Sequence, residues 1–130
     1  MKLVAAALIL REDTVLVCQR TKYQTMPLKW EFPGGKIEHG EQPTDGLRRE
    51  LEEELGIAAR IGDEVARIKH VYKNGNAVEL RFFLVREFEG EVENRIFADV
   101  RWVERSWLPD YDFLEADLEL VRQIAAGGII

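Results

Sequence analysis

The sequence has a single cysteine, no long apolar run and no excess of positive charge, and each absence excludes a class of protein. Cys18 has no partner within the chain for a disulfide, which favours a reducing, cytoplasmic setting. No stretch approaches the roughly 20 apolar residues that a transmembrane helix needs. We therefore expect a cytoplasmic protein with no membrane partner.

The N-terminal stretch MKLVAAALILRED has only a superficial likeness to a signal peptide. Its apolar run is short, and charged residues and a second strand-like run, which contains Cys18, follow it. We interpret it as a buried β-strand. Cys18 itself is expected to be a small buried core residue.

Positive charge is in deficit, with 18 Lys and Arg against 24 Asp and Glu and a net charge of -6. Nucleic acid polymers are held mainly by Lys and Arg, so the composition argues against DNA or RNA as a partner. A small anionic ligand is still possible if metal ions screen the repulsion.

The chain of 130 residues fits one domain, residues 1–130, and is long enough for a packed core. Apolar runs and turn residues predict two strands, a loop, a helix, three more strands and a final helix. This order implies an α/β or α+β fold with one helix on each side of a mixed sheet. The expected bounds are Leu3–Leu10, Thr14–Arg20, Pro43–Leu55, Ala58–Tyr72, Ala77–Glu87, Phe97–Val103 and Leu114–Ala126.

Turn and cap residues support these bounds. Pro43 suits the first helical position, and Gly56 is placed to cap the same helix at its C-terminus. The KNGN segment predicts a tight hairpin, because Asn-Gly accepts positive φ. The SWLPDYD segment is expected to be a loop. Leucines at every fourth position give the first helix a buried stripe, namely Leu47, Leu51 and Leu55.

The segment EFPGGKIEHGEQPTDGLRRELEEELGI crowds carboxylates behind a glycine turn. Glu50, Glu53 and Glu54 stand at i, i+3 and i+4, so we expect them to converge on one helix face. Such like-charge pairs weaken a helix by roughly 0.2–0.5 kcal/mol each, which argues for a function. Hard oxygen ligands suit Mg²⁺ or Mn²⁺. Any one glutamate taken alone is also compatible with a solvated acidic face.

The glycine turn that precedes the helix could complete a site together with these carboxylates. Glycine lets a backbone carbonyl reach a metal and lets a phosphate approach the chain. The N-terminal end of a helix also favours phosphate. Arg49 precedes the acidic stripe and can hold a neighbouring carboxylate in place. Together these features predict a cradle for a metal-bridged pyrophosphate.

This spacing resembles the Nudix signature G-x5-E-x7-R-E-U-x-E-E-x-G-U, with U an aliphatic residue, at every specified position over residues 35–57. The flanks WEFPGGKIEHGE and RELEEELGI are similar to the MutT branch of that family. The resemblance implies an α/β/α sandwich, with a mixed, curved sheet between two main helices. The residues that match are Gly35, Glu41, Arg49, Glu50, Leu51, Glu53, Glu54, Gly56 and Ile57.

The resemblance implies an Mg²⁺-dependent pyrophosphohydrolase, with Mn²⁺ able to substitute. Water would attack the β-phosphorus of a nucleoside triphosphate and release a monophosphate and pyrophosphate, as in the removal of 8-oxo-dGTP that supports DNA repair. Glu50 and Glu53 are the implied catalytic residues, and Glu50 would orient or deprotonate the water. The implied metal ligands are Gly34, through its carbonyl, Glu50, Glu53 and Glu54. Structural support of the box would come from Gly35, Glu41, Arg49 and Gly56.

The same resemblance places a nucleotide, the expected small-molecule partner of a monomer or homodimer, against Arg20, Glu31, Phe32, Pro33, Gly34 and Asp117. Asp117 stands where MutT reads oxidised guanine with asparagine, and where a cytidine-preferring relative has aspartate. An ionised carboxylate could accept from cytosine N4 or from guanine N1 and N2. Other interpretations stay open: a surface arginine for Arg20, a core residue for Phe32, and an early-helix residue favoured by the helix dipole for Asp117.

One position departs from the MutT pattern. Relatives usually carry a further glutamate six residues before the strand tryptophan, here Trp102, whereas this chain has Ile96. Glu93 or Asp99 could substitute for it. The alternative functions are a cytidine triphosphate pyrophosphohydrolase, a hydrolase of ADP-ribose or another nucleoside diphosphate derivative, and a non-catalytic Nudix binding module.

Overall fold

The computed structural model describes residues 1–130 and has more elements than the sequence predicts. Two α-helices are present, α1 (Pro43–Leu55) and α2 (Leu118–Ala125), with 3-10 turns η1 (Arg105–Asp110) and η2 (Glu115–Asp117). The strands are β1 (Lys2–Arg11), β2 (Thr14–Gln19), β3 (Trp30–Glu31), β4 (Gly34–Lys36), β5 (Ala58–Arg60), β6 (Glu64–Val71), β7 (Ala77–Val85), β8 (Glu87–Glu89) and β9 (Asp99–Glu104). Neither α-helix has the length and apolar content needed to cross a membrane.

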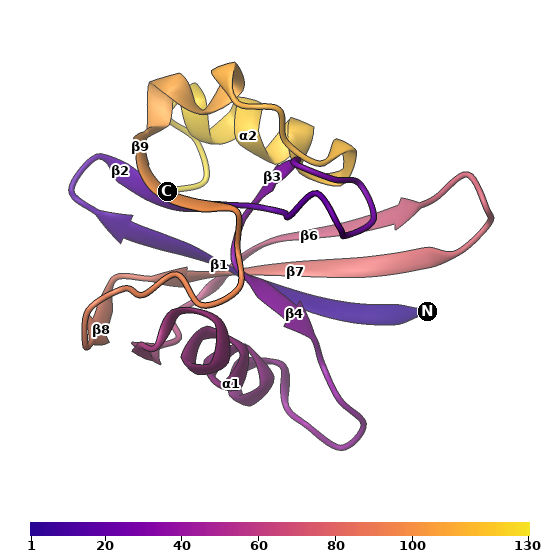
Figure 1. The fold of residues 1–130 in the computed structure, drawn as a ribbon, viewed down its shortest axis with the longest axis horizontal. Helices are drawn as coiled ribbons and strands as arrows, with labels where there is room; N and C mark the ends of the chain where they lie inside the picture. Colours follow the sequence, from indigo (N-terminus) through magenta and orange to yellow (C-terminus); the bar gives the residue numbers. More distant parts are fainter.

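Seven strands form one mixed sheet, with the order β3-β2-β1-β7-β6, β4 paired to β1 and β9 paired to β2. Strands β1 and β7 are parallel, and the other pairs are antiparallel. Helices α1 and α2 lie on opposite faces of this sheet (Figure 1). The predicted sandwich of a mixed sheet between two helices is confirmed.

Strand β1 is apolar between its two charged ends, Lys2 and Arg11, and both of its faces are covered. Successive side chains of a strand alternate between faces. Ala5, Ala7 and Ile9 pack in the cluster that contains the leucines of α1, and Ala6 and Leu8 pack in the cluster that contains α2. The predicted buried stripe of α1 is confirmed, since its three leucines are fully buried, namely Leu47, Leu51 and Leu55.

The prediction of one long strand over Ala58–Tyr72 is wrong, because the chain changes sheets at Gly62. The Gly62 N–H donates to the Leu84 carbonyl at 2.7 Å, and a Cβ atom at Gly62 would lie 2.9 Å from that oxygen. Strand β5 therefore pairs with β8 in a small separate sheet, whereas β6 pairs with β7. For the same reason the predicted strand Ala77–Glu87 is divided into β7 and β8.

The predicted turns and caps agree better with the structure. The β1–β2 hairpin is confirmed, with Arg11 opposite Thr14. The KNGN hairpin joins β6 to β7, and Gly75 has φ 86°. Helix α1 has the predicted bounds and ends on Gly56.

Three predicted segments differ in detail. The SWLPDYD segment, expected to be a loop, contributes to η1. The final helix begins at Leu118, four residues later than predicted, because Leu114 has an extended backbone and η2 follows it. Strand β3, in a stretch predicted to be a loop and turn, forms because Trp30 and Glu31 pair with the end of β2.

Candidate active site

The glycine turn, Gly34 and Gly35, lies between strand β1 and helix α1. Gly34 and Gly35 pair with Ala6 and Ala5 of β1. A Cβ atom at Gly34 would lie 2.7 Å from the Ala6 Cα, and one at Gly35 would lie 2.6 Å from Glu50 Oε2. Only glycines let the backbone come this close to both neighbours. The turn and the acidic face of α1 are thus brought together, as predicted.

Glu50 and Glu54 form the centre of the site. Oε1 of Glu54 is buried and has no hydrogen-bond partner. Burial, followed by the charge of Glu50 and a hydrogen bond with it, raises the pKa of Glu54 to about 9, although a backbone bond from Gly34 opposes this shift. Two adjacent carboxylates with an unpartnered buried oxygen are the donor set that a hard divalent cation needs. The residues present therefore fit Mg²⁺ or Mn²⁺.

Glu53 is more exposed than this pair. It is exposed and accepts a bond from Arg49 Nη1 at 3.3 Å. No three His, Cys, Asp or Glu side chains are grouped closely enough to hold a metal by themselves. Arg49 Nη1 also donates to Glu50 at 3.0 Å, so the same nitrogen bridges Glu50 and the exposed Glu53. The assignment of Glu53 as a metal ligand stays a prediction, since Mg²⁺ commonly binds one or two carboxylates and completes its shell with water and phosphate.

Arg49 organises the carboxylates around it. Its Nε donates to Glu41 at 2.8 Å, and its Nη1 donates to Glu50 at 3.0 Å. The hydrogen bonds from Arg49, followed by one from the Glu38 backbone, lower the pKa of Glu41 to about 2. Glu41 is thereby held as a permanent anion that fixes Arg49 and the loop before α1. This placement agrees with the supporting role predicted for both residues.

Asp117, the residue expected to contact the base, lies at the start of α2. Its side chain is 4% exposed and makes no hydrogen bond or ion pair within the protein. Burial, followed by the charge of Glu31, raises the pKa of Asp117 to about 8. A buried carboxyl group without a partner costs stability, which a ligand that donates hydrogen bonds would relieve.

Glu31 interacts electrostatically with both Asp117 and Glu54. Burial raises its pKa, while Arg20 opposes the shift. The charge of Glu31 acts on Asp117 on one side and on Glu54 on the other. The carboxyl groups of Asp117 and Glu54 are therefore both influenced by Glu31. The sequence offered no signal for this coupling, because its members come from elements far apart in the chain.

Arg20 is held beside Glu31 and is mostly buried. Its side chain is 17% exposed, and Nη1 lies 3.1 Å from Glu31 Oε1. Its other donors contact Thr25, where Nε reaches the carbonyl at 2.8 Å and Nη2 reaches the hydroxyl at 3.1 Å. Sequence reasoning missed Thr25, since a threonine in a loop carries no distinguishing pattern. Two of the five guanidinium N–H groups are left for a ligand.

Phe32 and Pro33 precede the glycine turn and anchor it to the core and to strand β1. Phe32 packs in the core between Phe82 and Phe113, with ring centroids 6.2 and 5.2 Å away. The buried Pro33 accepts a bond from the Ala7 N–H at 2.8 Å. Their predicted contact with a nucleotide stays a prediction.

Cys18 is buried as expected, and burial followed by the charges of Glu31 and Glu54 raises the pKa of its thiol.

The two acids considered as substitutes at Ile96 both form ion pairs with arginines. Glu93 pairs with Arg95 at 3.0 Å, and Asp99 pairs with Arg101 at 2.8 Å. Ile96 itself is 49% exposed. Neither acid bonds to a residue of the carboxylate pair on α1.

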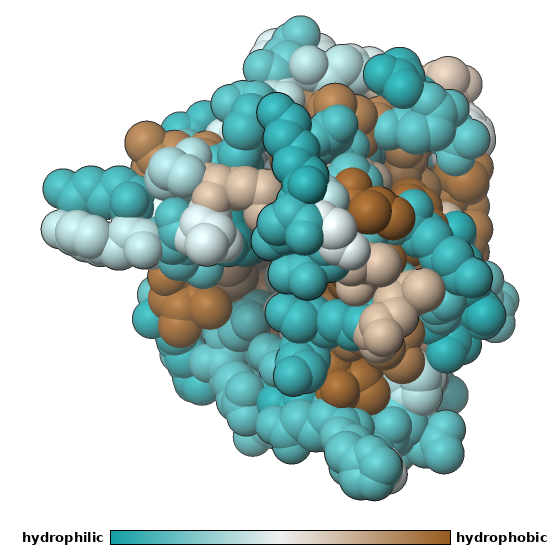
Figure 2. Space-filling view, turned by 90° about the vertical axis from the view of Figure 1, so that its right-hand side faces the viewer, coloured by the Kyte–Doolittle hydropathy of each residue, from teal (hydrophilic) through white to brown (hydrophobic).

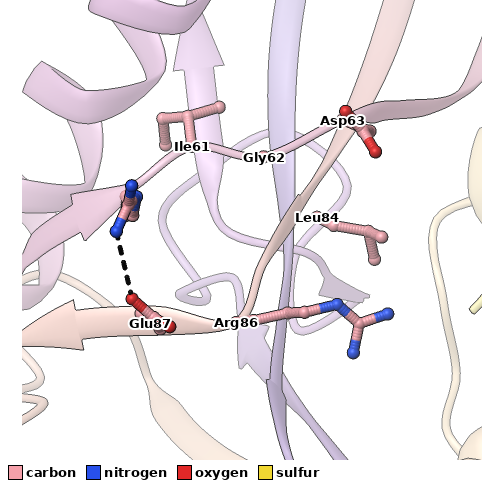
Figure 3. Close-up of a pocket in the computed structure, with 7 residues that line it drawn as sticks. Ile61, Gly62, Asp63, Leu84, Arg86 and Glu87 are labelled. Carbon is pink, nitrogen blue, oxygen red and sulfur yellow. Dashed lines mark hydrogen bonds and ion pairs between the residues drawn. The ribbon is translucent and has the colours of Figure 1, made fainter.

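Other surface features are separate from this site. A cavity of about 240 Å³ between the β5–β6 connection and the β7–β8 end is lined by Arg60, Ile61, Gly62, Asp63, Leu84, Arg86 and Glu87 (Figure 3). None of them belongs to the predicted site, and two acids balance two arginines. On the face in Figure 2, exposed apolar side chains occur in separate patches among hydrophilic ones.

Comparisons with known proteins agree with this geometry. The NUDIX domain family matches residues 1–124. An "8-oxo-dGTP diphosphatase" of Haemophilus influenzae is 35% identical over 122 residues, which cover 93% of this chain and 89% of that protein. A "CTP pyrophosphohydrolase" of Escherichia coli strain K12 is 32% identical over 123 residues, which cover 95% and 90%.

Among solved structures, the solution structure of the E. coli ORF135 protein has a TM-score of 0.86 and 32% identity, and the match covers 97% of this chain and 89% of that one. The family match covers nearly the whole chain and includes the glycine turn, Glu50 and Glu54. The chain belongs to the NUDIX domain family.

Proposed function

We propose that this protein hydrolyses nucleoside triphosphates to nucleoside monophosphates and pyrophosphate in a reaction that depends on Mg²⁺, with Mn²⁺ as a substitute. The observation that carries the proposal is the unpartnered buried Oε1 of Glu54 beside Glu50 and the glycine turn. Cations bound between the carboxylates and the phosphates would let this acidic protein accept a polyanionic substrate. The pair on α1 provides the ligands for such cations.

Each residue of the proposed site has a distinct role in binding the cation, the water or the phosphates. Glu50 and Glu54, with the Gly34 carbonyl and Glu53, would hold the cation, and Arg49 would keep Glu50 in place at 3.0 Å. Bound Mg²⁺ supplies charge that polarises phosphoryl oxygens and activates water. Glu50 would orient the attacking water by accepting its hydrogen bond. The glycine turn leaves room for phosphates beside the carboxylates.

For the substrate, we favour nucleotide-pool sanitation of the 8-oxo-dGTP or dGTP type. Relatives named 8-oxo-dGTP diphosphatase include one that is 35% identical over most of this chain. The phosphates would lie at Glu50 and Glu54, and the base would lie toward Arg20 and Asp117. Hydrogen bonds donated by guanine N1 and N2 would favour the ionised form of Asp117, which accepts them.

Asp117 also favours a second candidate, the hydrolysis of cytidine triphosphates. Its buried carboxyl group has no partner in the protein, and a carboxylate accepts well from cytosine N4. The relative named CTP pyrophosphohydrolase covers 95% of this chain at 32% identity. We further propose that residues 1–130 act as one domain in the cytoplasm, as a monomer or homodimer, without a nucleic acid polymer as partner.

A substrate panel with product analysis tests the function. The full chain would be incubated with 8-oxo-dGTP, dGTP, dCTP, CTP and ADP-ribose, with Mg²⁺ or with EDTA. We expect a monophosphate and pyrophosphate from at least one triphosphate, only when Mg²⁺ is present. The proposal fails if no triphosphate yields pyrophosphate.

A further inference from the structure

The last turn of α1 carries several negative charges and has no positive charge of its own to balance them. Three carboxylates, those of Glu52, Glu53 and Glu54, lie at the negative end of the helix dipole, and the turn contains no basic residue. The last carbonyl groups of a helix also lack partners within it. Both features weaken the turn that contains Glu54.

The loop that follows β8 supplies what the turn lacks. Arg95 Nη1 donates to the Glu52 carbonyl at 3.0 Å, and the Arg95 backbone N–H donates to the Glu54 carbonyl at 3.2 Å. The Glu93 N–H donates to the Leu55 carbonyl at 2.9 Å. The loop therefore brings three donors and the Arg95–Glu93 ion pair to the end of the helix.

Gly56 shows independently that this contact is built into the fold. Its φ of 69° is one that glycine adopts without strain. A Cβ atom there would also lie 2.8 Å from Arg95 Nη2 and 3.1 Å from Glu93 Oε2. A side chain at this position would displace the arginine from the helix end.

We propose that Arg95 is a positioning residue for the cation-binding carboxylates, acting through the last turn of α1. Its backbone N–H bonds to the Glu54 carbonyl, and its guanidinium, which also pairs with Glu93 at 3.0 Å, donates to the Glu52 carbonyl. The inference rests on the proposed cation-binding role of Glu54.

Binding of Mn²⁺ to the full chain, followed by electron paramagnetic resonance without nucleotide, tests this role. We expect Arg95→Ala to weaken Mn²⁺ binding about 10-fold, in the range typical for residues that orient metal ligands. Arg95→Lys should recover most of the affinity, because an ammonium group can still donate to the carbonyl and oppose the dipole. Arg95→Gln, which keeps a donor without the charge, provides the test if Arg95→Ala does not fold.

Arg122→Ala is the matched control. Arg122 pairs with Glu119 at 2.6 Å on α2, on the opposite face of the sheet, so its loss should leave Mn²⁺ binding unchanged. Wild-type affinity in Arg95→Ala, together with weakened binding in Glu54→Gln, would overturn this inference alone. Unchanged binding in Glu54→Gln would overturn the proposed cation site and the inference with it. A loss in Glu93→Gln as large as in Glu54→Gln would show that the loop provides a ligand, against the inference.

Discussion

A Cβ atom added to Gly35 would lie 2.6 Å from Oε2 of Glu50. The carboxylate is the end of a flexible side chain, so Gly35→Ala should displace it while the backbone stays in place. Misplacement of a reacting group by about 1 Å can lower turnover about 100-fold. We therefore expect Gly35→Ala to fold normally and to lose about 100-fold in pyrophosphate release, measured beside its melting temperature.

Gly34→Ala is the contrasting variant. Its Cβ would lie 2.7 Å from the Ala6 Cα, and backbone cannot move as a side chain can. We expect this variant to lose stability as well as activity. Wild-type turnover in Gly35→Ala would contradict the placement of Glu50 at the reacting phosphate.

The cation site can be tested with conservative substitutions on α1. We expect Glu53→Gln and Glu54→Gln to fold and to lose at least ~100-fold in Mg²⁺-dependent turnover, as for the loss of groups that bind or orient the metal. Glu52→Gln is the control, because Glu52 is an exposed neighbour on the same turn, and its turnover should be unchanged. If Glu53→Gln retains full turnover, Glu53 is only a surface partner of Arg49.

Asp117→Asn tests base recognition. An amide both donates and accepts, whereas an ionised carboxylate only accepts, so the variant should change the ranking of bases more than the best turnover rate. The measurement is kcat/KM for guanine and cytosine triphosphates with each protein. An unchanged ranking would argue that Asp117 serves the fold alone.

Asp117 also predicts how stability depends on pH. Its pKa in the folded protein, about 8, lies above the ordinary value of 3.8. The folded state thus holds a proton that the unfolded state releases, so this group lowers stability progressively as pH rises from about 4 to about 8. Asp117→Asn should remove that loss.

The gain in melting temperature from Asp117→Asn over wild type should therefore be larger at pH 8 than at pH 5. A difference of at least about 4 °C would correspond to about 1 kcal/mol in a chain of this size. Calorimetry of both proteins at the two pH values checks this. An equal difference at both would show that Asp117 does not titrate in this range.

The strongest sequence predictions concern features set by local spacing. Helix α1 has the predicted bounds, and its leucine stripe and Gly56 cap follow from a period of 3.6 residues and from the conformational freedom of glycine. Strand bounds were predicted less well, because strands end where their partners end. Gly62 divides a predicted strand only because the Leu84 carbonyl lies against it.

The sequence by itself determined the chemistry of the α1 face, since the intervals between Gly35, Glu50 and Glu54 fix which groups can meet across one turn and one helix. Only the tertiary structure decided which carboxylates meet. It bridges Glu50 and Glu53 through Arg49, brings Asp117 within the field of Glu31, and places Arg95 on the last turn of α1. These contacts join residues from different elements, and their geometry depends on how the sheet packs between its two helices.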